Sequence, residues 1–289
     1  SIGKDNQVNF VQPNAQSVAL NRVLGSDVSV IQGALTANGQ IFLVNPNGVL
    51  FTPTAQVDVG GLVATTLQLS KEDFMAGRYA LSGDSLATVS NEGTITAQGT
   101  GGQNGFIALV AARVINKGTL NALAGNVALT AANNVLLDLG GPLKIEVKQG
   151  AIDALIEQGG AIRANAGTIY LTAQAANELS TSAINVSGVV QADTLGANEQ
   201  GKIVLTASGS INVSGNIQAT GLHGGTISVQ APQVAITAGH LDASGTQQGG
   251  TIQVLALQQE NGDVGVPHRI DIAEDVVLNT SATHIGNGG

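Results

Sequence analysis

The sequence predicts an all-β chain that winds as a parallel β-helix. Three observations lead to this fold class: a repeat of about 20–27 residues, strands of alternating apolar and polar residues within it, and the composition. Of the 289 residues, 39 are glycine, 43% are hydrophobic and only 2% are aromatic. A core with so few rings must be built from Val, Ile, Leu and Ala, which are small enough to stack in layers.

The repeat consists of two short phrases that alternate along the chain. One phrase is a turn followed by a strand, and it occurs at residues 91–97, 116–122, 186–192, 213–219 and 238–243. The other is a glycine followed by an alternating apolar strand, and its copies begin at Gly105, Gly125, Gly167, Gly201, Gly225 and Gly250. We interpret the longer interval from Gly125 to Gly167 as about two turns of the helix. Leucine-rich, hexapeptide and calcium-binding nonapeptide repeats are excluded because their signature patterns are missing.

Each phrase follows the period of a β-strand. In the strand 168–172, Ile169 and Leu171 point to one face and Tyr170 points to the other. One coil cannot bury its own apolar face, so we expect stability to accumulate by stacking. At the corners we expect the glycines to adopt positive φ, and we expect the same of four asparagines that tolerate it. These are Asn91, Asn116, Asn133 and Asn134.

Two segments interrupt the period. Residues 70–77 begin with Ser70, have an acid three positions later and end in Gly77, which predicts a short helical turn. Residues 136–160 contain the strand 143–148 after a Gly-Gly-Pro turn, which we interpret as a hairpin excursion from the helix. For residues 151–158 we expect a short helix.

Composition excludes several classes of function. The net charge is −9 and the 11 Lys and Arg residues form no run, so we expect no nucleic-acid partner. No stretch of 18 apolar residues occurs, so we expect no membrane insertion. The chain has no cysteine, which suits a protein that crosses a membrane unfolded.

The most specific stretch surrounds the tetrad Asn45-Pro46-Asn47-Gly48, which lies between two apolar strands. The tetrad predicts a type I turn, with Asn45 capping through its side chain and Pro46 at the second position. Together with Asn21-Arg22-Val23 and the segments 10–13, 31–33, 37–39 and 60–66, it closely resembles the two-partner secretion (TPS) domain of filamentous-haemagglutinin-type exoproteins and adhesins.

The resemblance implies a right-handed, single-stranded β-helix of the pectin-lyase-like kind, which serves as the secretion signal and folding nucleus of a large surface protein. The implied partner is an outer-membrane β-barrel transporter with periplasmic POTRA modules. The implied location is the surface of a Gram-negative bacterium or the medium, reached through the periplasm. By resemblance, Asn45, Pro46, Asn47 and Gly48 form the secretion motif, and Asn21, Arg22 and Val23 form a second secretion-related stretch.

The resemblance is specific over residues 1–100, which we expect to form the core of the TPS domain, and residues 101–289 should continue its coils with an insertion near 136–160. A second family tetrad, N-P-N-L, is absent, and the nearest candidate, Gln12-Pro13-Asn14-Ala15, does not match it. Members of the family carry an N-terminal cap upstream of this start, so we expect the cap to be missing here.

No residue pattern predicts catalysis, a cofactor or a metal site. The acidic residues occur singly or at corners, and the denser group 271–275 is interpreted as a solvated loop. His223 and His240 could fall on neighbouring coils, but we expect solvent-exposed side chains. We expect a monomer, and the exoprotein could bind a host-cell or matrix ligand through downstream regions. Two alternatives stay open: an adhesive β-helix that itself binds host or matrix ligands directly, and a polysaccharide-active enzyme.

Overall fold

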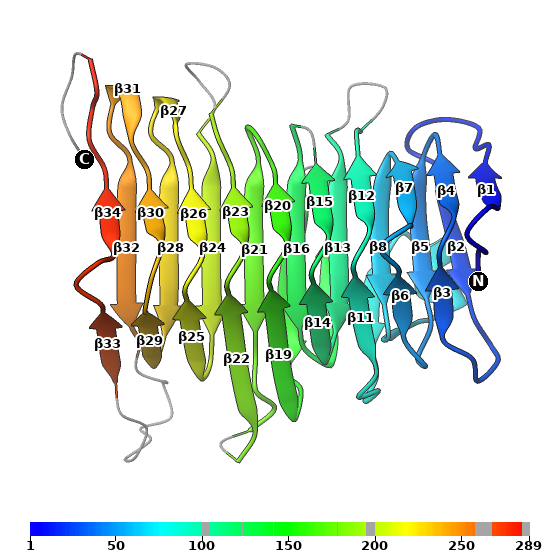
Figure 1. Cartoon of the computed structure of the whole chain (residues 1–289). Coiled ribbons are helices and arrows are strands. Elements are labelled where there is room, and N and C mark those ends of the chain that lie inside the picture. The colour runs from blue at the N-terminus through cyan, green and yellow to red at the C-terminus, as the bar shows by residue number, and fades with distance from the viewer. Residues whose placement is uncertain are drawn as a thin grey trace.

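The chain forms three long parallel sheets that run along one axis. The computed structural model describes residues 1–99, 104–122, 124–140, 142–177, 179–194, 200–257 and 268–284. Within these residues each coil passes through sheet C, then sheet A, then sheet B, and the next coil pairs strand for strand with it. Figure 1 shows the coils side by side, from the blue N-terminal end to the red C-terminal end. The predicted parallel β-helix is confirmed.

The strands of the three sheets are short and follow each other in regular order. Sheet C contains β2 (Val18–Arg22), β5 (Gln40–Val44), β8 (Gly61–Thr65), β13 (Phe106–Ala111), β16 (Asn126–Ala131), β21 (Thr168–Ala173), β24 (Lys202–Ala207), β28 (Thr226–Ala231) and β32 (Thr251–Ala256). Sheet A contains β3 (Ser29–Ile31), β6 (Val49–Phe51), β11 (Thr88–Asn91), β14 (Arg113–Asn116), β19 (Asp153–Gln158), β22 (Thr181–Val186), β25 (Ser210–Val213), β29 (Gln233–Ile236) and β33 (Arg269–Ile272).

Sheet B contains β1 (Gln7–Phe10), β4 (Ala34–Ala37), β7 (Gln56–Val59), β12 (Thr94–Ala97), β15 (Thr119–Ala122), β20 (Ala161–Arg163), β23 (Val189–Gln191), β26 (Asn216–Gln218), β30 (His240–Asp242) and β34 (Val277–Asn279). A small pair, β27 (Gly221–His223) and β31 (Gly245–Gln248), extends two coils beyond sheet B. The two repeat phrases thus correspond to two of the three sheets: the glycine phrase starts the strands of sheet C, and the turn phrase leads into strands of sheet B.

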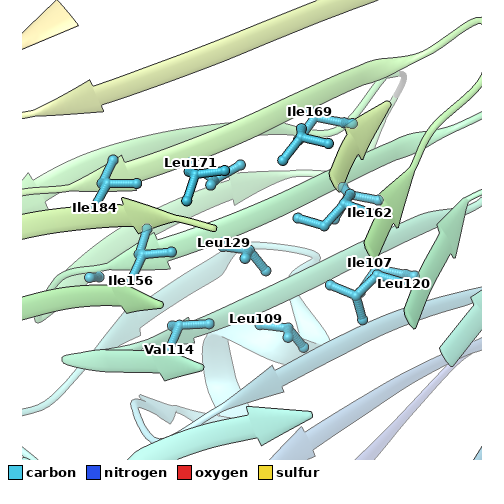
Figure 2. Packing of buried hydrophobic residues seen from close by; sticks show 14 of the residues in the cluster. Ile107, Leu109, Val114, Leu120, Leu129, Ile156, Ile162, Ile169, Leu171 and Ile184 are labelled. Atoms are coloured by element: carbon cyan, nitrogen blue, oxygen red, sulfur yellow. The ribbon is translucent and has the colours of Figure 1, made fainter. Parts of the chain in front are cut away.

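The core is a set of aliphatic columns inside the three sheets. In sheet C, Ile107 is in register with Val127, and Val127 with Ile169. Columns from sheets A and B face these residues, and Figure 2 shows side chains of all three sheets meeting in one interior. The inward side chains of the central coils are fully buried. Because these aliphatic columns are closely packed, they fix the register between neighbouring coils.

The glycines before the sheet C strands are needed for close backbone approach rather than for positive φ. A Cβ atom placed on Gly167 would lie 1.6 Å from the carbonyl oxygen of Gly125, and one on Gly125 would lie 1.8 Å from that of Gly105. None of the six glycines has φ in the left-handed region. The predicted reason for these glycines is therefore wrong: coils stacked at about 4.8 Å leave no room for a side chain at this corner.

The corner asparagines likewise have another role than predicted. All four, including Asn133 and Asn134, lack positive φ. Asn91 and Asn116 are fully buried and belong to a polar ladder: Asn91 Nδ2 donates to Asn116 Oδ1 at 2.8 Å, and Asn116 Nδ2 donates to Gln158 Oε1 at 2.8 Å. Gln158 Nε2 completes the ladder by donating to the Gly160 carbonyl at 3.0 Å. Stacked amides satisfy one another across coils, so they can be buried without losing hydrogen bonds.

The two interruptions of the repeat pack together outside the helix. They supply the antiparallel sheet D, with β9 (Gln68–Leu69), β10 (Tyr79–Ser82), β17 (Asn134–Asp138) and β18 (Lys144–Gln149). The predicted hairpin is thus present as β17 and β18. Sheet D covers the outer face of sheet C through a second apolar cluster that includes Phe42, Val63 and Leu81.

The helical turn predicted at 70–77 is α1 (Lys71–Met75). The Ser70 hydroxyl caps it by accepting a hydrogen bond from the Asp73 backbone N–H at 3.0 Å. Hydrogen bonds from Ser70 and then Arg78 hold the pKa of the Asp73 carboxyl below its ordinary value. Among the described residues, no helix is long and apolar enough to cross a membrane.

The short helix expected at residues 151–158 is wrong. Residues 153–158 form β19, whose side chains are alternately exposed and buried and which pairs with β14 and β22. This segment forms a strand rather than a helix because Ile156 then completes an apolar column and Gln158 completes the amide ladder. The interval from Gly125 to Gly167 is one coil rather than two, since β16 pairs directly with β21 and the excursion accounts for the extra length.

We predict that Gly167→Ala lowers the free energy of unfolding by about 3 kcal/mol or more, because the added methyl group collides with a backbone oxygen. Urea unfolding followed by circular dichroism measures the change. Gly25→Ala is the matched control, since a Cβ there meets nothing within 4 Å. Equal stability of the two variants would contradict the close-approach explanation.

We predict that Asn116→Ala costs about 2–4 kcal/mol, because it leaves a buried donor of Asn91 and a buried acceptor of Gln158 without a partner. Asn121→Ala, on the outward face of the neighbouring strand β15, should change stability by less than about 0.5 kcal/mol. The same urea titration compares them. A difference near zero would show that the ladder does not stabilise the fold.

Candidate functional site

The tetrad forms the tight turn between β5 and β6. The Gly48 N–H donates to the Asn45 carbonyl at 3.0 Å, which closes a β-turn with Pro46 at its second position. The Asn45 side chain accepts from the Asn47 N–H at 3.0 Å, as predicted for the capping residue. Gly48 has a φ of 115°, a region that side chains rarely adopt, so this position requires glycine.

Asn45 connects the turn to the coils on both sides. Its side chain is fully buried, and Nδ2 donates to the Asp27 carbonyl and to Ser29 Oγ, both at 2.9 Å. Its backbone N–H donates to the Thr65 carbonyl of the next coil at 2.9 Å. One residue therefore holds three successive coils at the corner between sheets C and A.

The other members of the tetrad bind the two flanking loops. Asn47 Nδ2 donates to the Gly25 carbonyl at 2.8 Å, on the side of the preceding coil. On the opposite side, the Ser85 hydroxyl donates to the Pro46 carbonyl at 2.5 Å. The loops 24–28 and 83–87 are thus fixed against the turn from opposite sides, and their conformation depends on it.

The second predicted stretch, 21–23, ends strand β2 next to the turn. Asn21 lies at the start of an inward column, in register with Leu43. Arg22 points outward, and its guanidinium donates to the Leu69 carbonyl of β9 at 3.2 Å. The Val23 N–H donates to the Val44 carbonyl, one residue before Asn45, at 2.9 Å. The structure therefore brings both predicted stretches together at one corner.

Three residues of this corner were not singled out by the sequence: Asp27, Ser29 and Ser85. Each is bonded to a tetrad residue across a coil boundary, at a sequence distance of 16 to 39 residues. Local patterns do not reveal such contacts. The register between coils would have been needed to find them.

Other candidate groups remain apart. His223 lies on β27 and His240 on β30, so they sit on consecutive coils but in different sheets. Asp271 is exposed on β33 and forms an ion pair with Arg269 at 2.6 Å. Over the described part of the chain, no three His, Cys, Asp or Glu side chains are close enough to hold a metal ion. Asp263, one of the acidic residues that occur singly, lies outside the described residues, as do residues 100–103 of the glycine-rich segment before Gly105.

The comparisons with known proteins agree on one family. The sequence model of the TPS secretion domain matches residues 1–219, well beyond the first 100 residues that carry the motifs. A heme/hemopexin-binding protein of Haemophilus influenzae (strain Rd) is 36% identical over 211 residues, which are 71% of this chain and 23% of that protein. A second Haemophilus influenzae heme/hemopexin-binding protein is 53% identical over 70 residues, 24% of this chain and 8% of that protein.

The HMW1 secretion domain from Haemophilus influenzae has the same fold, with a TM-score of 0.82 and 25% identity over 97% of this chain and 74% of that chain. The chain spans less than a quarter of the length of the first heme/hemopexin-binding relative. TPS domains engage an outer-membrane transporter partner, and these homologues are secreted proteins of Gram-negative bacteria. These matches agree with the coils and the corner turn described above, and the chain belongs to the TPS secretion domain family.

Proposed function

We propose that the chain is the export signal of a large surface exoprotein, and that the periplasmic POTRA modules of its outer-membrane transporter recognise it at the tetrad corner. The support is the position of Asn45: a buried amide that joins three coils at a corner where Pro46 and Asn47 are partly exposed. A structural turn needs only its own closing hydrogen bond. Here the side chains of Asn45 and Asn47 also fix an adjacent loop, which is typical of a preorganised binding surface.

We propose further that the domain nucleates folding of the chain that follows it. The support is the stacking itself: in the described chain each coil pairs strand for strand with the coil before it and shares its apolar columns, so the newest coil of an emerging chain would present an apolar ledge to the next one. An apolar ledge with unpaired strand edges is a template on which a further coil can pair. Each added coil would recreate the same ledge, so folding could proceed as the polypeptide emerges.

A catalytic role has no comparable support. The family is a secretion domain, and the relatives named above are described by binding or secretion. We therefore assign the chain no enzymatic activity, neither on polysaccharides nor on other substrates.

We predict that Asn45→Ala reduces secretion of the full-length exoprotein at least ten-fold, because it frees the loop 24–28. The matched control is Thr54→Ala, which removes a comparable bond from a turn to the preceding coil, Thr54 Oγ1 to the Gln32 carbonyl at 2.8 Å, at the other end of β6. Quantitative immunoblots of medium and cells measure secretion. Undiminished export of Asn45→Ala, or equal loss in both variants, would contradict recognition at the tetrad.

A second candidate function is direct ligand binding, which the names of the two Haemophilus influenzae relatives suggest. His223 and His284 line one surface hollow with Thr246, Gln247 and Gln248, and imidazole is a common axial ligand of heme iron. We expect a titration of the purified chain with hemin to shift the Soret band. The double variant His223→Ala/His284→Ala should abolish the shift, and no shift with the unaltered chain would exclude this role.

A further inference from the structure

Large aliphatic side chains are exposed around the tetrad. Leu24 is 88% exposed, Leu86 is 60% exposed and Val28 is 44% exposed. Leu24 and Val28 precede β3 on one coil, and Leu86 precedes β11 two coils later, with the tetrad on the coil between them. Since coils are spaced by about 4.8 Å, the two loops lie about 10 Å apart along the axis. In Figure 1 the chain enters β3 and β11 from the lower edge of the molecule.

The tetrad holds both loops in place by hydrogen bonds. Asn47 binds the carbonyl of Gly25, next to Leu24, and Asn45 binds that of Asp27, next to Val28. On the other side, the Ser85 hydroxyl donates to the Pro46 carbonyl and also accepts from the Ala87 N–H at 3.1 Å. These bonds hold the backbone on both sides of Leu86. The exposed side chains are therefore presented by an ordered backbone, and little conformational entropy would be lost when a partner binds them.

This arrangement differs from scattered surface leucines. Single exposed apolar residues are normal on protein surfaces, whereas neighbouring exposed apolar side chains are typical of interaction sites; here one turn holds both of the loops that carry them. Leu24 and Leu86 are mostly exposed, so the fold does not require their side chains, whereas Val28 is less exposed and its Cγ1 lies close to Gly48 of the turn. The tetrad residues themselves offer a partner little apolar area: Asn45 is fully buried, and Asn47 is engaged on both the loop and Asn45.

The charge around the group indicates the chemistry of the partner. Each loop carries one exposed carboxylate, Asp27 or Asp84, and no Lys or Arg; Arg22, two residues before Leu24, is also exposed, and its guanidinium is bonded to the Leu69 carbonyl of β9. The whole chain has a net charge of −9. An apolar group with an acidic rim is complementary to an apolar groove with a basic rim, and it is repelled by the anionic surface of a membrane.

We propose that Leu24, Val28 and Leu86 are the side chains that contact the transporter, and that they enter an apolar groove of its periplasmic modules whose rim carries Lys or Arg. This inference rests on the proposed function and deepens it. The tetrad is then a positioning element: it acts through the two loops and has few contacts of its own with the partner.

The test measures binding of the purified chain to the soluble periplasmic domain of its cognate transporter by isothermal titration calorimetry. The double variant Leu24→Ser/Leu86→Ser leaves every tetrad hydrogen bond intact, and we expect its Kd to rise at least ten-fold. Asp27→Lys/Asp84→Lys should weaken binding as well, with a loss that shrinks at high salt. Circular dichroism and urea unfolding should be unchanged in both variants, since the substituted side chains are exposed.

The matched control is Leu179→Ser, which removes a leucine that is 98% exposed at the same corner, three coils beyond Leu86. It should bind like the unaltered chain. Tight binding by Leu24→Ser/Leu86→Ser, or an equal loss with Leu179→Ser, would overturn this inference while leaving recognition by the transporter intact. Failure of the unaltered chain to bind would overturn the proposed function and the inference with it. Binding of the unaltered chain to anionic vesicles instead would assign the group to a membrane.

Discussion

The parallel pairing of each coil with its neighbours is the constraint on which the rest of this molecule depends. A single coil has no apolar interior of its own, so its Val, Ile and Leu side chains are buried only when they align with those above and below. The same stacking decides which residues are allowed at the corners. Glycine is required where two backbones meet, as at Gly125 and Gly167, and amides are allowed inside only where they form a ladder.

Stacking also explains why the tetrad lies where it does. At most positions of the corner between sheets C and A, the chain either turns tightly or leaves the helix to build sheet D. The tetrad coil has a short turn between coils with longer connections, so its side chains reach the loops on both sides. Because the turn is bonded to the coils on both sides, its geometry depends on the correct stacking of the first coils. A transporter that binds this corner would therefore respond to the stacking of the first coils as well as to the sequence of the turn.

Much of the fold followed from local periodicity, and the errors have a common cause. The phrases beginning at Gly105, Gly125 and their equivalents identified the strands of sheet C, and the turn phrases identified sheet B. Sheet A had no phrase of its own, so β19 was expected to be a helix although it completes a column. The β-turn at Asn45–Gly48 was predictable because its closing bonds are local. Its bonds to Asp27, Ser29 and Ser85 were not, since they depend on register between coils, which no short window contains.

The central claim is that residues far apart in sequence lie one above another in register, and a pair of spin labels tests it directly. The chain has no cysteine, so labels on Thr96→Cys and Gln218→Cys are unambiguous. These residues occupy one outward column of sheet B, four coils apart, through Asn121, Arg163 and Gln191. The expected result in double electron–electron resonance is a narrow distribution that corresponds to a backbone separation of about 19 Å. A broad distribution, or a distance beyond about 35 Å, would contradict the stacked coils.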